Sequence, residues 1–188
     1  MTISALSERL QQALSASASG DADTAIALFR QAVDEEPGSP LPPFLLGGEF
    51  AQLGRVDEAI QAFAATLLLS PEFHIARYQM GLLQYTSGHA ALALVTWQPL
   101  LQLPESNALR SFAIGFAALA EDRFADATAH FRAGQALNLD NVPLNNDIQL
   151  VIDRIEALNA TPARDAEAPT SEDASHVLLS NYRGGSVH

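Results

Sequence analysis

The stretch PLPPFLLGGEFAQLGRVDEAIQAFAATLLLSP, residues 40–71, decides the fold. Apolar side chains recur at steps of three and four residues before Gly54 and again after it, as they do on the buried face of an α-helix. Gly54 suits a helix end that needs a positive φ, and Asp57 and Glu58 suit the positive end of the next helix. Because Pro71 stops the second helix, the stretch predicts two helices joined by a short turn.

The same pattern returns along the chain every thirty-four residues. Each second helix carries an alanine and, four residues later, a large aromatic, as in the pairs Ala25 and Phe29, Ala59 and Phe63, Ala93 and Trp97, and Ala127 and Phe131. Each first helix carries a small residue at Ala13, Gly47, Gly81 or Gly115, and each turn a residue at Gly20, Gly54, Gly88 or Asp122. A period of this length holds two helices of about 12–15 residues and short turns. We expect the small residues to let the two helices approach closely, with the aromatic side chain filling the space beside them.

These columns resemble the tetratricopeptide repeat, whose pattern sets a small residue in the first helix, then Gly, then Ala-x-x-x-Phe and then Pro. The family's tryptophan near the start of the first helix is missing from every copy. Four copies are expected at about residues 6–39, 40–73, 74–107 and 108–141. The resemblance implies an all-α fold, a right-handed α-solenoid of helix-turn-helix repeats.

The repeats are expected to form a domain over residues 1–159, closed by a capping helix at 143–159. An apolar stripe marks that helix, and a terminal repeat needs such a cover because each unit buries its face only against a neighbour. Pro99 falls inside the second helix of the third repeat, which it should kink or shorten. Residues 160–188 are interpreted as a disordered acidic linker followed by a short apolar tail with Val177, Leu178, Leu179 and Tyr182.

Composition excludes several classes of function. All 10 basic residues are arginines, and 22 acidic residues oppose them, which gives a formal net charge of −12 that repels nucleic acids and anionic membranes. The absence of lysine and cysteine removes Schiff-base chemistry, thiol nucleophiles and disulfides. No metal or cofactor motif is present, so we expect neither an enzyme nor a bound cofactor. Because no apolar segment has the length of a signal peptide or membrane span, a cytoplasmic protein is expected.

In the family that the repeats resemble, the first helices line a concave groove, and stepping at helical spacing through each copy gives its surface. The predicted protein-binding residues are Leu41, Phe44, Ile75, Tyr78, Leu82, Tyr85, Leu109, Phe112 and Phe116. A contiguous apolar and aromatic surface of this kind suits an apolar peptide or an amphipathic helix of another protein. The same stripe is also compatible with ordinary packing between neighbouring first helices.

The favoured hypothesis is a non-enzymatic interaction module, an adaptor, scaffold or chaperone. In size, charge and groove the chain resembles the bacterial type III secretion chaperones that shield translocator proteins. One alternative is that the chain's own tail occupies the groove as a lid. A second alternative is self-association into a homo-oligomer with a structural role.

Overall fold

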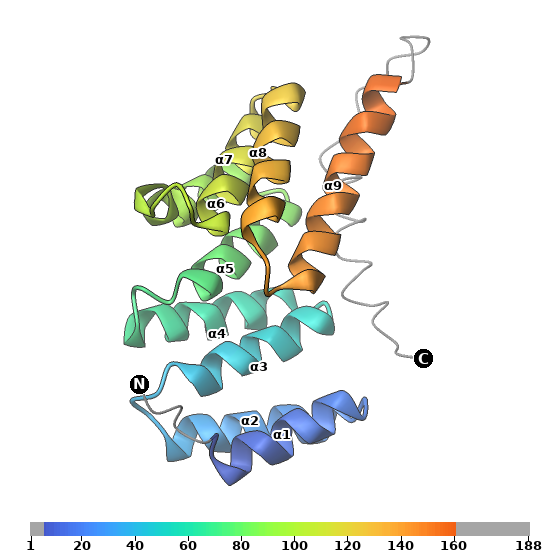
Figure 1. Cartoon of the computed structure of the whole chain (residues 1–188). Coiled ribbons are helices and arrows are strands. Elements are labelled where there is room, and N and C mark those ends of the chain that lie inside the picture. Colours follow the sequence, from blue (N-terminus) through green and yellow to red (C-terminus); the bar gives the residue numbers. More distant parts are fainter. Residues whose placement is uncertain (1–5, 161–188) are drawn as a thin grey trace. The chain divides into compact units, whose positions relative to one another are not determined.

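The computed structural model describes residues 6–160, and every element in that range is a helix (Figure 1). The described residues contain no strand, which confirms the predicted all-α class. By its contacts the chain divides into two compact units, the first ending at Met80 and the second beginning at Gly81. The boundary lies within α5, and each unit is described by itself.

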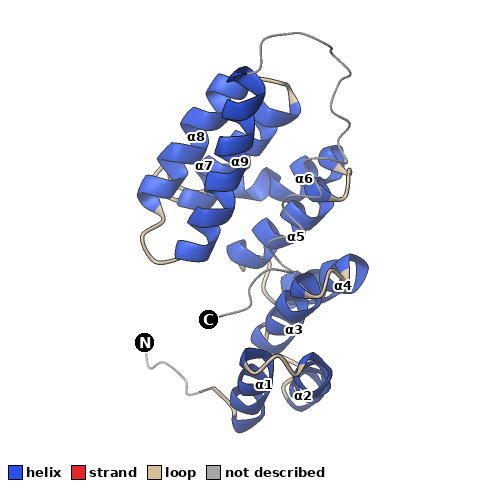
Figure 2. Ribbon diagram, turned by 90° about the vertical axis from the view of Figure 1, so that its right-hand side faces the viewer, coloured by secondary structure: helices blue, strands red, loops and turns tan. Residues whose placement is uncertain are grey.

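Unit 1 is built from antiparallel helix pairs. Its helices are α1 (Glu8–Ala18), α2 (Ala22–Glu35), α3 (Leu41–Gln52), α4 (Val56–Leu69) and the first half of α5 (His74–Thr86). Helix α1 packs on α2, α2 on α3, and α3 on α4, so each of these four helices contacts its neighbours among them (Figure 2). This arrangement is the one that helix-turn-helix repeats adopt.

Unit 2 continues the pattern with the second half of α5. Its further helices are α6 (Ala90–Trp97), the 3-10 helix η1 (Gln98–Gln102), α7 (Ala108–Ala120), α8 (Phe124–Leu137) and α9 (Val142–Ala160). The pairing of α7 with α8 is the most extensive in this unit, and α9 packs on α8.

The turn inside each repeat has one backbone geometry. The turn residues Gly20, Gly54, Gly88 and Asp122 have φ values of 79°, 70°, 82° and 57°. At Gly54, the Arg55 N–H donates to the Phe50 carbonyl at 2.9 Å and the Gly54 N–H to the Ala51 carbonyl at 3.0 Å. This pair of bonds is the Schellman motif, which closes a helix through one residue of left-handed conformation. Glycine therefore recurs at this position of the sequence because the turn requires a positive φ.

The small residues of the first helices make room for the aromatic side chains of the second helices. A Cβ placed on Gly47 would lie 2.7 Å from the Phe63 ring, and one on Gly115 would lie 2.6 Å from the Phe131 ring. At Gly81 the Trp97 indole is closer still, at 2.2 Å. These contacts agree with the close approach expected from the sequence.

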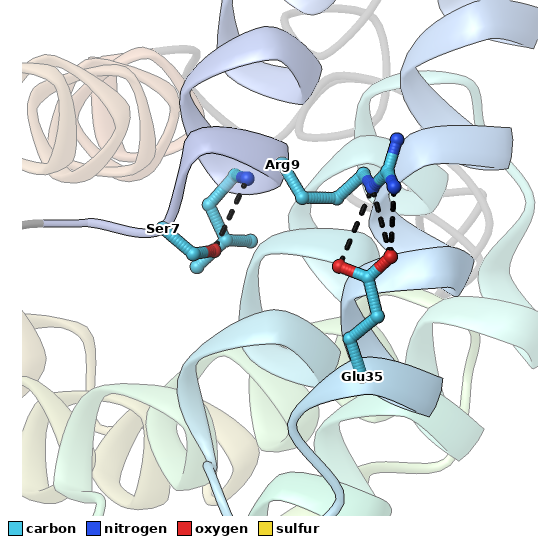
Figure 3. Close-up of polar contacts among 4 residues, drawn as sticks. Ser7, Arg9 and Glu35 are labelled. Atoms are coloured by element: carbon cyan, nitrogen blue, oxygen red, sulfur yellow. Dashed lines mark hydrogen bonds and ion pairs between the residues drawn. The ribbon is translucent and has the colours of Figure 1, made fainter.

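A helix cap and a surface ion pair lie at the start of α1 (Figure 3). The Ser7 hydroxyl accepts a hydrogen bond from the Leu10 N–H at 3.4 Å, which caps the helix. Arg9 pairs with Glu35 at the end of α2 at 2.8 Å. Because Glu35 is exposed and Arg9 is only half-buried, solvent screens this ion pair and it adds little to stability.

Pro99 shortens the third repeat's second helix as predicted. Helix α6 has 8 residues and ends at Trp97, whereas α2, α4 and α8 each have 14 residues. The chain continues as the 3-10 helix η1, which carries Pro99 in its first turn and buries Leu100. A proline in that position lacks only an N–H that the first turn leaves unpaired.

The last helix, α9, spans Val142–Ala160, one residue longer at each end than expected. Of the apolar residues expected on this helix, Ile148, Val151, Ile152 and Ile155 are buried, whereas Leu158 is 41% exposed. The helix also buries Leu144. Asparagines join its start to the end of α8: the Asn138 side chain donates to Asn145 Oδ1 at 2.8 Å, and the Asn145 side chain donates to the Asn138 carbonyl at 2.9 Å. Reciprocal bonds of this kind fix the entry angle of α9.

Candidate functional site

The predicted groove residues of unit 1 lie on α3 and α5, and burial divides them. Leu41, Phe44 and Ile75 are half-buried. Tyr78 is completely enclosed, with 0% of its surface exposed. The structure therefore places Tyr78 in the interior, and of the residues expected in this unit only the other three have surface left for a partner.

The same division holds in unit 2. Tyr85 and Leu109 are half-buried, whereas Leu82, Phe112 and Phe116 are buried. The Phe116 ring centroid lies 5.1 Å from that of Trp97 and 4.9 Å from that of Phe131.

Phe112 faces α8 at Gly134, where a Cβ would lie 2.4 Å from the ring. The Phe112 and Phe116 side chains thus pack between helices, the alternative that the sequence had left open for this stripe. Of the predicted stripe in this unit, Tyr85 and Leu109 are left with exposed surface.

Phe44 belongs to a small aromatic cluster in unit 1. Its ring centroid lies 4.8 Å from that of Phe73 and 5.9 Å from that of Phe63. Phe44 and Phe73 are half-buried, so the cluster presents aromatic surface. Sequence reasoning missed Phe73 because the equivalent positions of the other repeats carry no aromatic: they are Ser39, Asn107 and Asn141.

The hydroxyl of Tyr85 has a raised pKa, so it ionises less readily than that of a free tyrosine. Its ring lies 6.0 Å from Trp97 and 5.1 Å from Phe116, centroid to centroid. Burial, with a smaller effect of the nearby Asp122 carboxylate, raises the pKa of Tyr85 to about 12. The phenol is therefore neutral at physiological pH and can donate a hydrogen bond beside an apolar ring, the combination that makes tyrosine common in interfaces.

Sequence reasoning also missed a buried polar contact between the first helices of the first two repeats. Glu49 of α3 is 6% exposed, and its Oε2 accepts a hydrogen bond from the Ser17 hydroxyl of α1 at 2.5 Å. Burial of a carboxylate is costly unless a donor faces it, and Ser17 supplies one. A single acid inside the apolar run Phe44–Phe50 is the signal that could have found this contact.

The described residues offer apolar surface rather than clustered polar chemistry. No three His, Asp or Glu side chains among them lie close enough to hold a metal ion. Within the same part of the chain, no helix has both the length and the apolar character needed to cross a bilayer. The expected tail residues Val177, Leu178, Leu179 and Tyr182 lie outside the described range, as does the expected linker.

Comparisons with known proteins agree with this geometry. A family model described as the tetratricopeptide repeat matches residues 16–85. No curated protein matches the chain in sequence.

Several solved structures share the fold. MamA 41-end from Desulfovibrio magneticus RS-1 has a TM-score of 0.60 at 14% identity, with 95% of this chain and 95% of that chain covered. YrrB, described as a TPR protein with an unusual peptide-binding site, has a TM-score of 0.57 at 16% identity, with 93% of this chain and 84% of that chain covered. At such identities the likeness shows the fold alone, and it confirms the predicted stack of helix-turn-helix repeats.

Proposed function

Because residues 16–85 match the tetratricopeptide repeat and the described helices have its fold, we propose that this chain is a non-enzymatic interaction module that binds an apolar peptide or an amphipathic helix of another protein. The fold is typical of interaction scaffolds. In each unit the binding surface consists of half-buried first-helix residues, which we call the recognition face of that unit: Leu41, Phe44 and Ile75 in unit 1, and Tyr85 and Leu109 in unit 2.

One observation carries the proposal: apolar side chains stay partly exposed at the same helix face in successive repeats. Their neighbours in the stripe, among them Phe112 and Phe116, are buried by packing between helices and offer no surface to a partner. The remaining apolar surface would gain about 25 cal/mol per Å² if a partner covered it. Tyr85 and Phe44 are the aromatic anchors of the recognition face, and rigid aromatic side chains commonly dominate binding energy.

The net charge of the chain indicates a second property of the segment that it binds, namely basic residues beside the apolar ones. With a net charge of −12, the protein attracts segments whose apolar residues are flanked by arginine or lysine, and it repels acidic ones. An extended or helical segment is favoured because the recognition face consists of single side chains at helical spacing rather than an enclosed cavity. An occupant of this kind is consistent with YrrB, which shares the fold and is a TPR protein with an unusual peptide-binding site.

Affinity capture with matched variants tests the proposal. Leu109→Glu places a charge on the recognition face, whereas Ala133→Glu places the same charge on an exposed position of α8. We expect the full-length protein and Ala133→Glu to retain the same partner, identified by mass spectrometry, and Leu109→Glu to lose it by a factor of ten or more. Thermal unfolding of both variants controls for folding. Equal capture by the two variants would place the binding site elsewhere.

The partner then decides the finer role. A folded protein that presents one exposed segment to the recognition face would make the chain an adaptor or scaffold. A segment that is unfolded without this protein, and aggregates in its absence, would make the chain a chaperone. Hydrogen exchange of the partner segment, free and bound, separates the two.

A further inference from the structure

The outward side of α6 exposes large apolar side chains. Leu92 is 50% exposed and Val95 is 66% exposed, and residues three apart lie on one side of an α-helix. Leu101 of η1 is 37% exposed and lies six residues after Val95. In a 3-10 helix, side chains three residues apart lie on the same side. Leu92, Val95 and Leu101 are called the α6 patch below.

The other repeats of the same chain show that the fold does not require apolar side chains at the positions of Leu92 and Val95. At the position of Leu92 they carry Thr24, Glu58 and Asp126, and at the position of Val95 they carry Ala27, Gln61 and Ala129. Three second helices are thus built with polar or small residues at places where the third repeat has Leu and Val. Exposed apolar side chains that packing does not need indicate a surface that is covered by something else.

The charge pattern around the α6 patch indicates what covers it. No ionisable side chain occurs from Ala90 to Pro104, although the whole chain carries a net charge of −12. Two copies of so acidic a protein repel each other over most orientations. A segment without charge is where a second copy can approach with the least repulsion.

We propose that the α6 patch is a self-association surface, on which a second copy of this chain docks through the same three side chains. A two-fold axis brings like residues together, so one apolar patch serves both partners. The patch offers on the order of a few hundred Å² per copy, less than the ~800 Å² per partner of a stable interface. The dimer is therefore weak and concentration-dependent, with a Kd between about 1 µM and 1 mM.

Salt dependence distinguishes this dimer from one held by ion pairs. Added salt screens the repulsion between two chains of like charge and leaves apolar contact intact. Dimerisation through the α6 patch therefore strengthens when the salt concentration rises from about 0.01 M to 1 M, a range over which the screening length falls about tenfold.

Sedimentation equilibrium of the full chain over a concentration series tests the proposal. The variant Leu92→Glu/Val95→Gln introduces the residues that the second repeat carries at these positions, Glu58 and Gln61. The matched control, Thr24→Glu/Ala27→Gln, introduces the same two side chains and the same change of charge at exposed positions of α2. We expect the wild type and the control to dimerise alike, and the patch variant to need at least tenfold higher concentration.

Two results would overturn the proposal: a wild type that stays monomeric to the millimolar range, or a patch variant that dimerises as the wild type does. Circular dichroism melting of all three proteins shows whether each is folded. Partner capture through the recognition face uses other residues and other helices, so the patch variant keeps it. Failure of self-association and failure of the proposed function are thus separate outcomes.

Discussion

Gly48 and Gly81 both lie inside first helices and differ in what surrounds them. A Cβ on Gly48 would meet nothing within 4 Å, whereas one on Gly81 would lie 2.2 Å from Trp97 Nε1. Gly48→Ala is expected to raise the free energy of unfolding by about 0.5–1 kcal/mol because alanine favours the helix. Gly81→Ala is expected to lower it by about 1–3 kcal/mol because the buried indole must shift. Urea unfolding measures both, and a gain at Gly81 would contradict the packing described.

Tyr78 separates two accounts of the first-helix stripe. If it faced a partner, its substitution would reduce binding and leave stability nearly unchanged, whereas a side chain with 0% exposure supports the protein itself. Tyr78→Ala is therefore expected to cost about 3–5 kcal/mol of unfolding free energy through the cavity it leaves. Tyr78→Asp should abolish folding because it buries an unpaired charge. If the melting temperature of Tyr78→Ala were close to that of the wild type, the burial of Tyr78 would be contradicted.

Tyr85 makes stability depend on alkaline pH. Its pKa is raised from 10.0 to about 12 in the folded protein, so the unfolded chain loses this proton first as pH rises. The neutral Tyr85 therefore contributes fully to the free energy of unfolding below pH 10, and this contribution is lost between about pH 10 and 12. Because the chain has no lysine or cysteine, few other groups titrate there.

The melting temperature of the wild type is expected to fall more steeply over this range than that of Tyr85→Phe, which cannot ionise at this position. Tyrosinate absorbance, followed in parallel, reports the ionisation itself. Parallel pH profiles for the two proteins would show that Tyr85 is not held neutral by its surroundings.

At the scale of the element, the turn between α7 and α8 departs from the other three. It has Asp122 at φ 57°, where the equivalent turns have glycine. A residue with a Cβ is strained in this conformation, although aspartate tolerates it better than most. Asp122→Gly is expected to raise the free energy of unfolding by about 0.5 kcal/mol, after the greater freedom of glycine in the unfolded chain is subtracted.

Gly88→Ala is the control, because Gly88 has φ 82° and a Cβ added there would meet nothing within 4 Å. It isolates the backbone cost and should lower the free energy of unfolding by about 1–2 kcal/mol. Denaturant unfolding of the two variants gives opposite signs if the left-handed conformation is the cause. A loss of stability in Asp122→Gly would mean that interactions of the aspartate side chain stabilise the protein by more than the strain of its backbone conformation costs.

Local rules account for the elements that the sequence predicted. The glycine and alanine columns follow from turn geometry and from the contact with Phe63, Trp97 and Phe131, which act within one repeat. The stripe residues were harder to assign because their burial depends on helices beyond their own. Phe116 is enclosed by Trp97 of the preceding repeat as well as by Phe131, and no spacing rule distinguishes it from the half-buried Leu109.

At the scale of the whole molecule, the helix pairs repeat the same interior packing, while their exposed residues differ from one repeat to the next. The interior columns keep the helix pairs alike, which leaves the exposed positions free to differ between repeats. The recognition face and the α6 patch lie at such positions, on first helices and on a second helix respectively. Comparison of exposed positions between repeats would have found the α6 patch from sequence, because Leu92 and Val95 stand where other repeats are polar or small.

The central claim is that this protein binds a partner segment through its recognition face. Site-specific photocrosslinking in the full chain tests it most directly, with the photoreactive residue placed at Leu109 in one protein and at Ala133 in another. The account predicts a single crosslinked partner at Leu109, joined through an apolar segment with basic flanks, and none at Ala133. Crosslinking of the same partner at Ala133 and not at Leu109 would contradict it.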